Sequence, residues 1–385
     1  MNNFSFQMST NYVFGKDKHK KIGELVKPYA DKVLLVYGGG SIKRNGVYDG
    51  VTASLKENGV AYIELSGIQA NPRYEKVQEG IALLRKENPG LVLAVGGGSV
   101  IDTSKAIAMG AATDDVWNFF ANGGEPTKVL PVATILTIPA AGSEVSPDAV
   151  ITYQGRKLGY SSQQIRPVAS IVNPEIFMSL PKNQIANGVC DMMSHIFERY
   201  FTQTDHTDLI DSLAESTLNT IMRNALVLMK DPKNYDAWAE VSLGGSFAHN
   251  GFLGCGRIQD WGCHGMEHEL SAQDEKVAHG AGLAVLTPTW MRYVYKEKPA
   301  MFFQFATNVM DIKPERDIEK TINAGIDKLQ QFFVALGQPT TLRELGFNEN
   351  SPLEEMAKKG AGDGFMGNFK PLYWQDILAI YKACL

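Results

Sequence analysis

Residues 91–102 read Leu-Val-Leu-Ala-Val-Gly-Gly-Gly-Ser-Val-Ile-Asp, and this stretch decides the fold of the first half of the chain. The short apolar run at 91–95 ends in glycines, a pattern typical of a strand buried in a parallel sheet. Residues 100–108 then have helical character. A strand, a glycine turn and a helix in this order form a candidate phosphate-binding site, because glycines let the backbone approach an anion and the helix start supplies free N–H donors.

The same pattern occurs earlier in the chain. The apolar residues 33–37 are followed by Gly38-Gly39-Gly40-Ser41 and by a segment with helical character at 42–58. Neither copy has the G-x-G-x-x-G fingerprint of the standard dinucleotide-binding fold, and a single glycine triplet can be no more than a tight turn. Two copies after two buried strands favour a bound nucleotide, since open α/β sheets bind ligands at the carboxyl ends of their strands.

The remaining pattern divides the chain near Leu180. Further strands are predicted at 4–14, 61–65, 129–138 and 168–172, with a hairpin at 149–160 and helices at 20–30 and 71–86. Beyond residue 180, long helical periodicity takes over, at 184–201, 207–229, 235–252, 281–295, 316–336 and 374–384. A length of 385 residues also favours two domains. We therefore expect an α/β domain with a Rossmann-like parallel sheet at 1–180 and an all-helical domain at 181–385.

Candidate metal ligands lie in the helical half. Asp191 and His195 are four residues apart, so a helix presents both on one face, although such pairs are more often solvated. His264, His268 and His279 are three of the seven histidines and lie close together among glycines. Asp191, His195, His264 and His279 would place one carboxylate and three imidazoles around a divalent ion such as Fe(II) or Zn(II).

Composition excludes several classes of protein. The net charge is -5, with 44% hydrophobic and 21% charged residues, so the sequence gives no electrostatic reason to expect nucleic acid or an acidic membrane as partner. The longest apolar runs are far too short to span a membrane, and residues 1–6 lack the features of a secretory signal. The four cysteines show no C-x-x-C pairing. We therefore expect a soluble cytoplasmic protein without a disulfide framework.

Several motifs in one order resemble the iron-dependent (group III) alcohol dehydrogenases, in particular their NADPH-dependent butanol dehydrogenase and aldehyde reductase branch. The match extends over nearly the whole chain. The resemblance implies a dehydroquinate synthase-like architecture, which consists of the α/β domain and the all-helical domain expected above. The resemblance implies that Asp191, His195, His264 and His279 bind Fe(II), with Zn(II) as a substitute. The matching motifs are Gly96-Gly97-Gly98-Ser99-x-x-Asp102, 137–144, Asn173-Pro174-Glu175, Asp191-x-x-x-His195, His264-x-x-x-His268 and His279-Gly280.

The resemblance also implies a dinucleotide site in the first half. It assigns Gly97, Gly98 and Ser99 to the pyrophosphate, and the other candidates for cofactor contact are Asn71, Asp102, Thr137, Ser143, Lys157 and Leu180. Ser143 can alternatively cap a turn only. Relatives that prefer NAD carry an aspartate where this chain has Gly38. Gly38, Gly39 and Ser41, with Lys43 and Arg44 nearby, leave room and positive charge for an added phosphate, so NADP(H) is expected over NAD(H).

The resemblance implies that the enzyme interconverts aldehydes and primary alcohols, butanal and butanol among them. A divalent metal would polarise the carbonyl while a nicotinamide delivers hydride, and His268 is the candidate proton relay, or else a packing residue near the metal. The segment between His268 and His279 is one residue longer than the family's pattern. Relatives commonly form homodimers. The alternatives are an NAD-dependent alcohol or polyol dehydrogenase, a dehydroquinate synthase-like lyase, and a non-catalytic binding scaffold.

Overall fold

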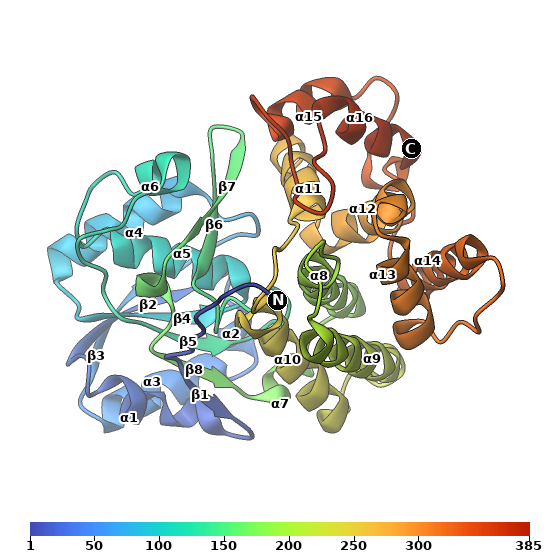
Figure 1. Cartoon of the computed structure of the whole chain (residues 1–385). Helices are drawn as coiled ribbons and strands as arrows, with labels where there is room; N and C mark the ends of the chain where they lie inside the picture. The colour runs from blue at the N-terminus through green and yellow to red at the C-terminus, as the bar shows by residue number, and fades with distance from the viewer. The chain divides into compact units, whose positions relative to one another are not determined.

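The computed structural model describes residues 1–385, which form two compact units (Figure 1). The helical unit comprises Met1–Phe6, Pro181–Pro232 and Leu243–Leu385, and the α/β unit comprises Gln7–Leu180 and Lys233–Ser242. One boundary therefore follows Leu180. Three others follow Phe6, Pro232 and Ser242, and the last of these divides helix α10, Tyr235–His249.

The α/β unit contains a parallel sheet of six strands in the order β1-β8-β5-β4-β2-β3. Its central strand β4 is buried along its whole length, as expected for a short apolar run in a parallel sheet. The strands are β1 (Asn11–Phe14), β2 (Lys32–Tyr37), β3 (Ala61–Leu65), β4 (Leu91–Gly96), β5 (Val132–Leu136) and β8 (Ala169–Val172). The predicted Rossmann-like sheet is confirmed.

Helices cover both faces of this sheet. Figure 1 shows α4 and α5 on one side and α1 and α3 on the other. The helices are α1 (Ile22–Val26), α2 (Ser41–Arg44), α3 (Val47–Glu57), α4 (Tyr74–Glu87), α5 (Gly98–Met109), α6 (Trp117–Asn122) and α7 (Pro174–Phe177). A separate hairpin pairs β6 (Asp148–Tyr153) with β7 (Arg156–Ser161). Its turn residues, Gln154 and Gly155, both have positive φ, as a two-residue hairpin turn requires.

The structure corrects three local predictions in this unit. Only Asn11–Phe14 of the predicted strand region 4–14 pairs with the sheet, and Met1–Phe6 belongs to the helical unit. The predicted helix 42–58 is two helices, because Gly46 adopts a left-handed φ of 79° between them. The predicted hairpin at 149–160 extends from 148 to 161, and Lys157 is a buried residue of its second strand, β7.

The helical unit is built around α8, Lys182–Tyr200, which packs against α9 and α12. From Gly188 to Tyr200 every residue of α8 is buried, as expected for a helix surrounded by others. The other helices are α9 (Asp208–Lys230), α10, α11 (Gly262–Gln273), α12 (His279–Val294), α13 (Pro299–Gln304), α14 (Ile318–Ala335), α15 (Leu353–Ala361) and α16 (Trp374–Ala383). The sequence patterns did not identify α11, α13 and α15.

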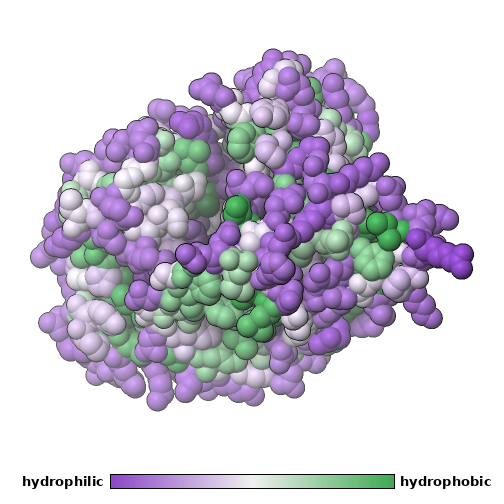
Figure 2. All heavy atoms as spheres, in the orientation of Figure 1, coloured by the Kyte–Doolittle hydropathy of each residue, from purple (hydrophilic) through white to green (hydrophobic).

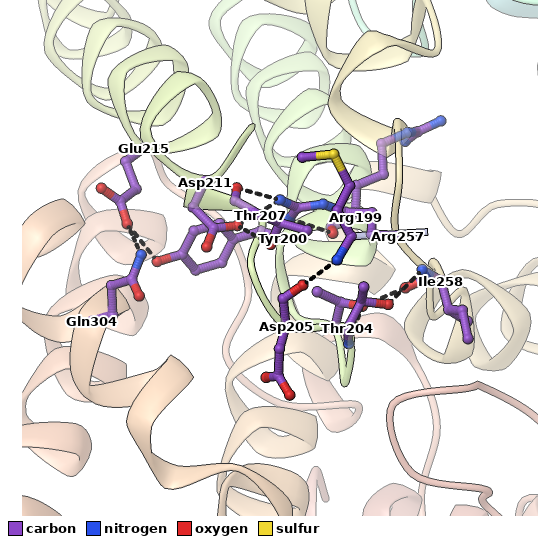
Figure 3. Close-up of polar contacts among 12 residues, drawn as sticks. Arg199, Tyr200, Thr204, Asp205, Thr207, Asp211, Glu215, Arg257, Ile258 and Gln304 are labelled. Carbon is purple, nitrogen blue, oxygen red and sulfur yellow. Dashed lines mark hydrogen bonds and ion pairs between the residues drawn. The ribbon is translucent and has the colours of Figure 1, made fainter. Parts of the chain in front are cut away.

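A buried arginine fixes the loop that leads into α11. The Arg257 guanidinium lies 2.6 Å from Asp211 Oδ1 and donates to the carbonyl oxygens of Arg199 and Thr207, at 3.1 and 3.2 Å (Figure 3). Its side chain is fully buried, so losing the carboxylate partner would leave an uncompensated charge inside the protein. This network ties the end of α8 and the start of α9 to the segment before α11.

Apolar side chains are mostly enclosed within the two units. The face drawn in Figure 2 is largely hydrophilic, with hydrophobic atoms in smaller areas. None of the helices is both long and apolar enough to cross a membrane.

Candidate functional site

Helix α8 supplies the first two candidate metal ligands. Asp191 and His195, one turn apart, point toward one another, and His195 Nδ1 lies 3.5 Å from Asp191 Oδ1. Both side chains are less than a tenth exposed. They are therefore part of the interior of the helical unit and not the solvated pair that this spacing more often gives.

Two further histidines reach the same carboxylate oxygen from other helices. His264 of α11 places Nε2 3.9 Å from Asp191 Oδ1, and His279, the first residue of α12, places Nε2 3.7 Å from it. Ligands about 2.1 Å from a tetrahedral ion lie roughly 3.4 Å apart, so this spacing is close to that of a metal site. The structure thus brings together all four residues that the sequence predicts as ligands.

The chemistry of these atoms also fits a cation. Asp191 Oδ1, His195 Nδ1 and His264 Nε2 are buried and have no hydrogen-bond partner. A buried polar atom without a partner costs about 1–3 kcal/mol, so a convergent set of them indicates an additional group. A divalent ion accepts one lone pair from each of these atoms, which satisfies all three at once.

Two buried glutamates orient the imidazoles. Glu198 Oε1 accepts from His264 Nδ1 at 2.8 Å, and Glu267 Oε2 forms a short contact with His279 Nδ1. In both rings the opposite nitrogen, Nε2, faces Asp191. A carboxylate behind a histidine fixes the tautomer and makes the free nitrogen a better metal ligand. Glu267, His268 and His279 also form a close group, in which Glu267 has this supporting position.

Glu198 also determines where α11 begins. Its carboxylate accepts the backbone N–H groups of Trp261 and His264, at 2.7 and 2.8 Å. Trp261 has a left-handed φ of 72°, which is costly for a bulky residue and persists only where the surroundings impose it. Glu198 of α8 therefore fixes the start of α11. Its carboxylate holds Trp261, the strained residue just before the helix, and orients the ring of His264.

Close helix packing brings His279 to the same place. A Cβ atom on Gly280 would lie 2.0 Å from the carbonyl oxygen of Asn187, so only glycine allows α12 to start this near to α8. Similarly, a Cβ on Gly282 would meet Glu267 Cγ at 2.8 Å. The glycines interleaved with the histidines thus have a steric role in assembling the site.

Burial and nearby charge act differently on two of the histidines. Burial lowers the pKa of His195 well below its usual value, and the neighbouring His249, His264 and Arg199 lower it further. Burial also lowers the pKa of His264, but the nearby carboxylates of Asp191 and Glu198 outweigh it and raise the pKa to about 9. The two carboxylates that raise the pKa of His264 also attract a cation to this position.

The sequence patterns missed three residues around this centre: Glu198, Glu267 and His249. Glu198 and Glu267 follow His195 and His264 by three residues, so helical spacing alone would have placed them beside the ligands. The rings of His249 and Trp261 lie 4.1 and 5.8 Å from the ring of His195. No spacing rule connects these two residues to α8, because they come from other segments.

Other residues near the motifs have structural roles. Met266 and Leu253, which lie close to the histidine motifs in the sequence, are fully enclosed in the core. The loop around Gly367 is anchored: Asp260 Oδ1 accepts the N–H groups of Asn368 and Phe369, both at 2.6 Å. His268 is partly exposed, with its ring 5.6 Å from that of His279.

The candidate nucleotide residues follow neighbouring strands of the α/β sheet. Gly38 follows β2, Gly97 follows β4 and Thr137 follows β5, and these three strands are adjacent. All three residues therefore lie at the carboxyl edge of the sheet, where open α/β folds bind nucleotides. Asn71, with a left-handed φ of 51°, precedes α4, whereas Leu180 is the last residue before the helical unit.

The turn at Gly97 leaves the backbone bare. Gly97 is the N-cap residue of α5 and has no side chain that could bond to the first N–H groups of the helix. A Cβ atom on Gly97 would lie 3.1 Å from the side chain of Ile138. A Cβ on Gly96 would overlap Val100 at 2.4 Å. The start of α5, with Gly98 and Ser99 in its first turn, is thus open to an anion such as a pyrophosphate.

Asp102 and Ser143 are bound to each other. Ser143 Oγ donates to Asp102 Oδ1 at 2.6 Å, and the buried Lys105 donates to Ser143 Oγ at 2.9 Å. Lys105 also donates to the carbonyl oxygens of Ser143, Ser146 and Asp148, at 2.7, 3.0 and 2.6 Å. This network fastens the segment after β5 to α5, beside the open helix start.

Comparison with known proteins gives matches along the whole chain. Residues 9–174 match the family described as iron-containing alcohol dehydrogenase, and residues 185–385 match the C-terminal part of the Fe-containing alcohol dehydrogenase family. The chain is 42% identical to NADH-dependent butanol dehydrogenase A of Clostridium acetobutylicum, with 99% of both chains covered. It is 36% identical to the NADPH-dependent aldehyde reductase YqhD of Escherichia coli, with 91% of each covered.

The solved structures give the same result. The crystal structure of NADH-dependent butanol dehydrogenase A from Thermotoga maritima superposes with a TM-score of 0.95 at 38% identity, covering 100% of this chain and 99% of the other.

Proposed function

Because the chain belongs to the iron-containing alcohol dehydrogenase family, we propose that it interconverts aldehydes and primary alcohols by hydride transfer with NADP(H). The observation that carries the proposal is the convergence of Asp191 Oδ1, His195 Nδ1 and His264 Nε2, three buried atoms without hydrogen-bond partners. His279 completes the proposed ligand set. In this proposal, the helical unit binds the metal and the α/β unit binds the dinucleotide.

An Fe(II) ion held there, or Zn(II) in its place, would act as a Lewis acid toward a carbonyl oxygen, and the nicotinamide would supply hydride. The chain's own residues prepare for this chemistry. Glu198 and Glu267 keep Nδ1 of His264 and His279 engaged, so that each Nε2 remains available. His268, partly exposed and one turn after His264, is the proposed carrier of the proton between the product oxygen and solvent.

On the nucleotide side, the N–H groups at the start of α5 are proposed to bind the pyrophosphate, with Gly97, Gly98 and Ser99 in contact. Thr137 lies beside them at the same sheet edge, and Asn71, Lys157 and Leu180 are proposed to line the rest of the dinucleotide. Asp102 and Ser143 support this edge through their mutual hydrogen bond. Their proposed contribution is therefore to shape the site around the cofactor.

The choice of NADP(H) rests on the turn after β2. Gly39 and Gly40 have open space where a side chain would be, and no acidic residue stands at 38–41 to repel an added phosphate. Two of the named similar proteins are described as NADH-dependent. NAD(H) is therefore the rival cofactor, and the experiment below compares the two.

The proposed substrates are short and medium aliphatic aldehydes and alcohols, with butanal as the test compound. An apolar site discriminates weakly between chain lengths, so a broad range is expected. We also propose a homodimer, on the family resemblance alone, which light scattering of the purified protein would test.

The test measures oxidation of NADPH and NADH with butanal before and after chelation. We expect NADPH oxidation to disappear when the metal is stripped and to return with Fe(II) or Zn(II). Metal content is measured on the same samples. Aldehyde reduction that persists in demonstrably metal-free protein would contradict the proposal, and so would the absence of hydride transfer to any aliphatic aldehyde.

A further inference from the structure

A cluster of charged and aromatic side chains stands at the carboxyl end of β2 and β3. Glu64, near the end of β3, accepts hydrogen bonds from Tyr37 Oη at 2.5 Å and Tyr48 Oη at 2.6 Å. Lys43 Nζ lies 3.6 Å from Glu64 Oε2, and 5.1 and 4.5 Å from the ring centres of Tyr37 and Tyr48. One carboxylate and two rings therefore hold a single ammonium group.

This cluster lies at the edge of the sheet where the adenosine ribose of the cofactor is expected to bind. In doubly wound folds the strand beside the one that carries the pyrophosphate turn ends at the adenosine ribose, where the 2′-substituent is recognised. Here β4 carries the Gly97 turn, and β2 is its neighbour. Lys43 belongs to α2, which begins at Ser41 directly after the glycines of β2. Lys43, a cation in the short helix after this turn, is thus already paired with an acid.

We propose that the Lys43–Glu64 pair sets the preference between NADP(H) and NAD(H), with Glu64 restraining the preference that Lys43 confers on the 2′-phosphate. This inference rests on the proposed function. Lys43 alone would attract the dianionic phosphate, whereas the pair is neutral and favours neither ribose. Tyr37 and Tyr48 keep Glu64 in place, so the carboxylate cannot follow Lys43 toward a ligand without losing two hydrogen bonds.

The state of Glu64 agrees with this role. Partial burial raises the pKa of Glu64, but the hydrogen bonds from Tyr37 and Tyr48 outweigh it and lower the pKa overall. The group is therefore ionised at neutral pH. The side chains of Lys43 and Glu64 are 48% and 32% exposed, so a ligand can reach both. The proposal rests on Lys43, because the ammonium group of Lys43 is the one that contacts Glu64 and the two tyrosine rings.

The same strand provides a matched control. Lys32 begins β2 and pairs with Glu87 at 2.8 Å, with side chains 33% and 32% exposed. Six residues of extended strand separate the two pairs by about 20 Å, well beyond the screening length of roughly 8 Å at physiological salt. Glu87 is the last residue of α4 and lies against the first residue of β2, so Glu87→Gln removes one negative charge at the opposite end of that strand.

The experiment measures binding of adenosine 2′,5′-bisphosphate and adenosine 5′-monophosphate by calorimetry on the whole protein. We expect Glu64→Gln to raise the ratio of the two affinities about tenfold in favour of the bisphosphate, the scale of one charge beside a dianion near a surface. Lys43→Gln should lower the ratio, and Glu87→Gln should leave it unchanged. The NADPH to NADH ratio of kcat/KM should move in parallel.

Each other outcome is decisive. An unchanged ratio in Glu64→Gln, or an equal change in Glu87→Gln, overturns the inference while leaving the proposed function intact. If the unsubstituted protein binds neither nucleotide, the proposed function itself fails. Thermal unfolding of each variant shows whether the substituted protein is folded.

Discussion

At the scale of single residues, the candidate centre depends on acids that do not touch the proposed metal. Asp191 is surrounded by imidazole nitrogens, and Glu198 and Glu267 stand behind two of those rings. In such a site the affinity for the metal depends on how the histidine rings are oriented as well as on which residues are the ligands. The sequence pattern identifies the inner residues, because Asp-x-x-x-His and clustered histidines stand out, whereas a glutamate in a helix resembles any surface residue.

Glu267→Gln tests this support. The amide cannot hold His279 Nδ1–H as strongly as the carboxylate, so we expect metal affinity to fall about 10- to 100-fold. Chelator competition with Zn(II) measures the affinity. Glu269→Gln is the control, since Glu269 is on the same helix but lies 2.9 Å from Lys359 of α15. Equal affinity losses in the two variants would show that the effect is not specific to His279.

At the scale of elements, Lys105 joins α5 to the segment before β6. It is completely buried and donates to three carbonyl oxygens of residues 143–148. Burial lowers the pKa of Lys105 to about 8, although Asp102 opposes the shift. The protein therefore encloses a group that the unfolded chain keeps protonated up to pH about 10.5.

The sign of the pH dependence follows from this difference. Between pH 8 and about 10.5 the unfolded state binds more protons than the folded state, so the contribution of Lys105 to stability rises with pH in that window. Lys105→Met should be less stable than the unsubstituted protein at pH 7, by about 1–3 kcal/mol, because the carbonyl groups lose their donor. Urea unfolding should show that gap widening toward pH 10. A gap that narrows over this range would contradict the assigned pKa.

At the scale of the whole molecule, the proposed metal site and the proposed nucleotide site belong to different structural units. All four proposed metal ligands lie in the helical unit, and all the proposed nucleotide residues lie in the α/β unit. A ligand stabilises the part of a protein that binds it, by about 4 kcal/mol at a thousandfold excess over Kd.

Hydrogen exchange should therefore distinguish the two ligands. We expect Zn(II) to slow exchange first in α8, α11 and α12, and adenosine 5′-monophosphate to slow it at the start of α5 and the end of β4. Removing the metal with a chelator should reverse the first effect only. Protection by Zn(II) that is strongest in the α/β unit would place the metal elsewhere.

The sequence by itself determined the periodic part of this protein. Apolar runs ended by glycine specify the parallel strands β2 and β4, and helical periodicity specifies α8, α9, α12 and α14, because both signals are local and repeat over many residues. It also determined the family, through motifs whose order and spacing few unrelated chains share. It failed at α11, where small residues and histidines replace an apolar stripe.

Only the tertiary structure decided how separate segments meet. Glu198 reaches the start of α11, Gly280 allows α12 to touch α8, and Glu64 of β3 pairs with Lys43 of α2. None of these contacts has a sequence period, since each joins residues far apart in the chain or on different elements. Their geometry depends on how helices and strands pack, and packing is decided by the whole set of buried side chains at once.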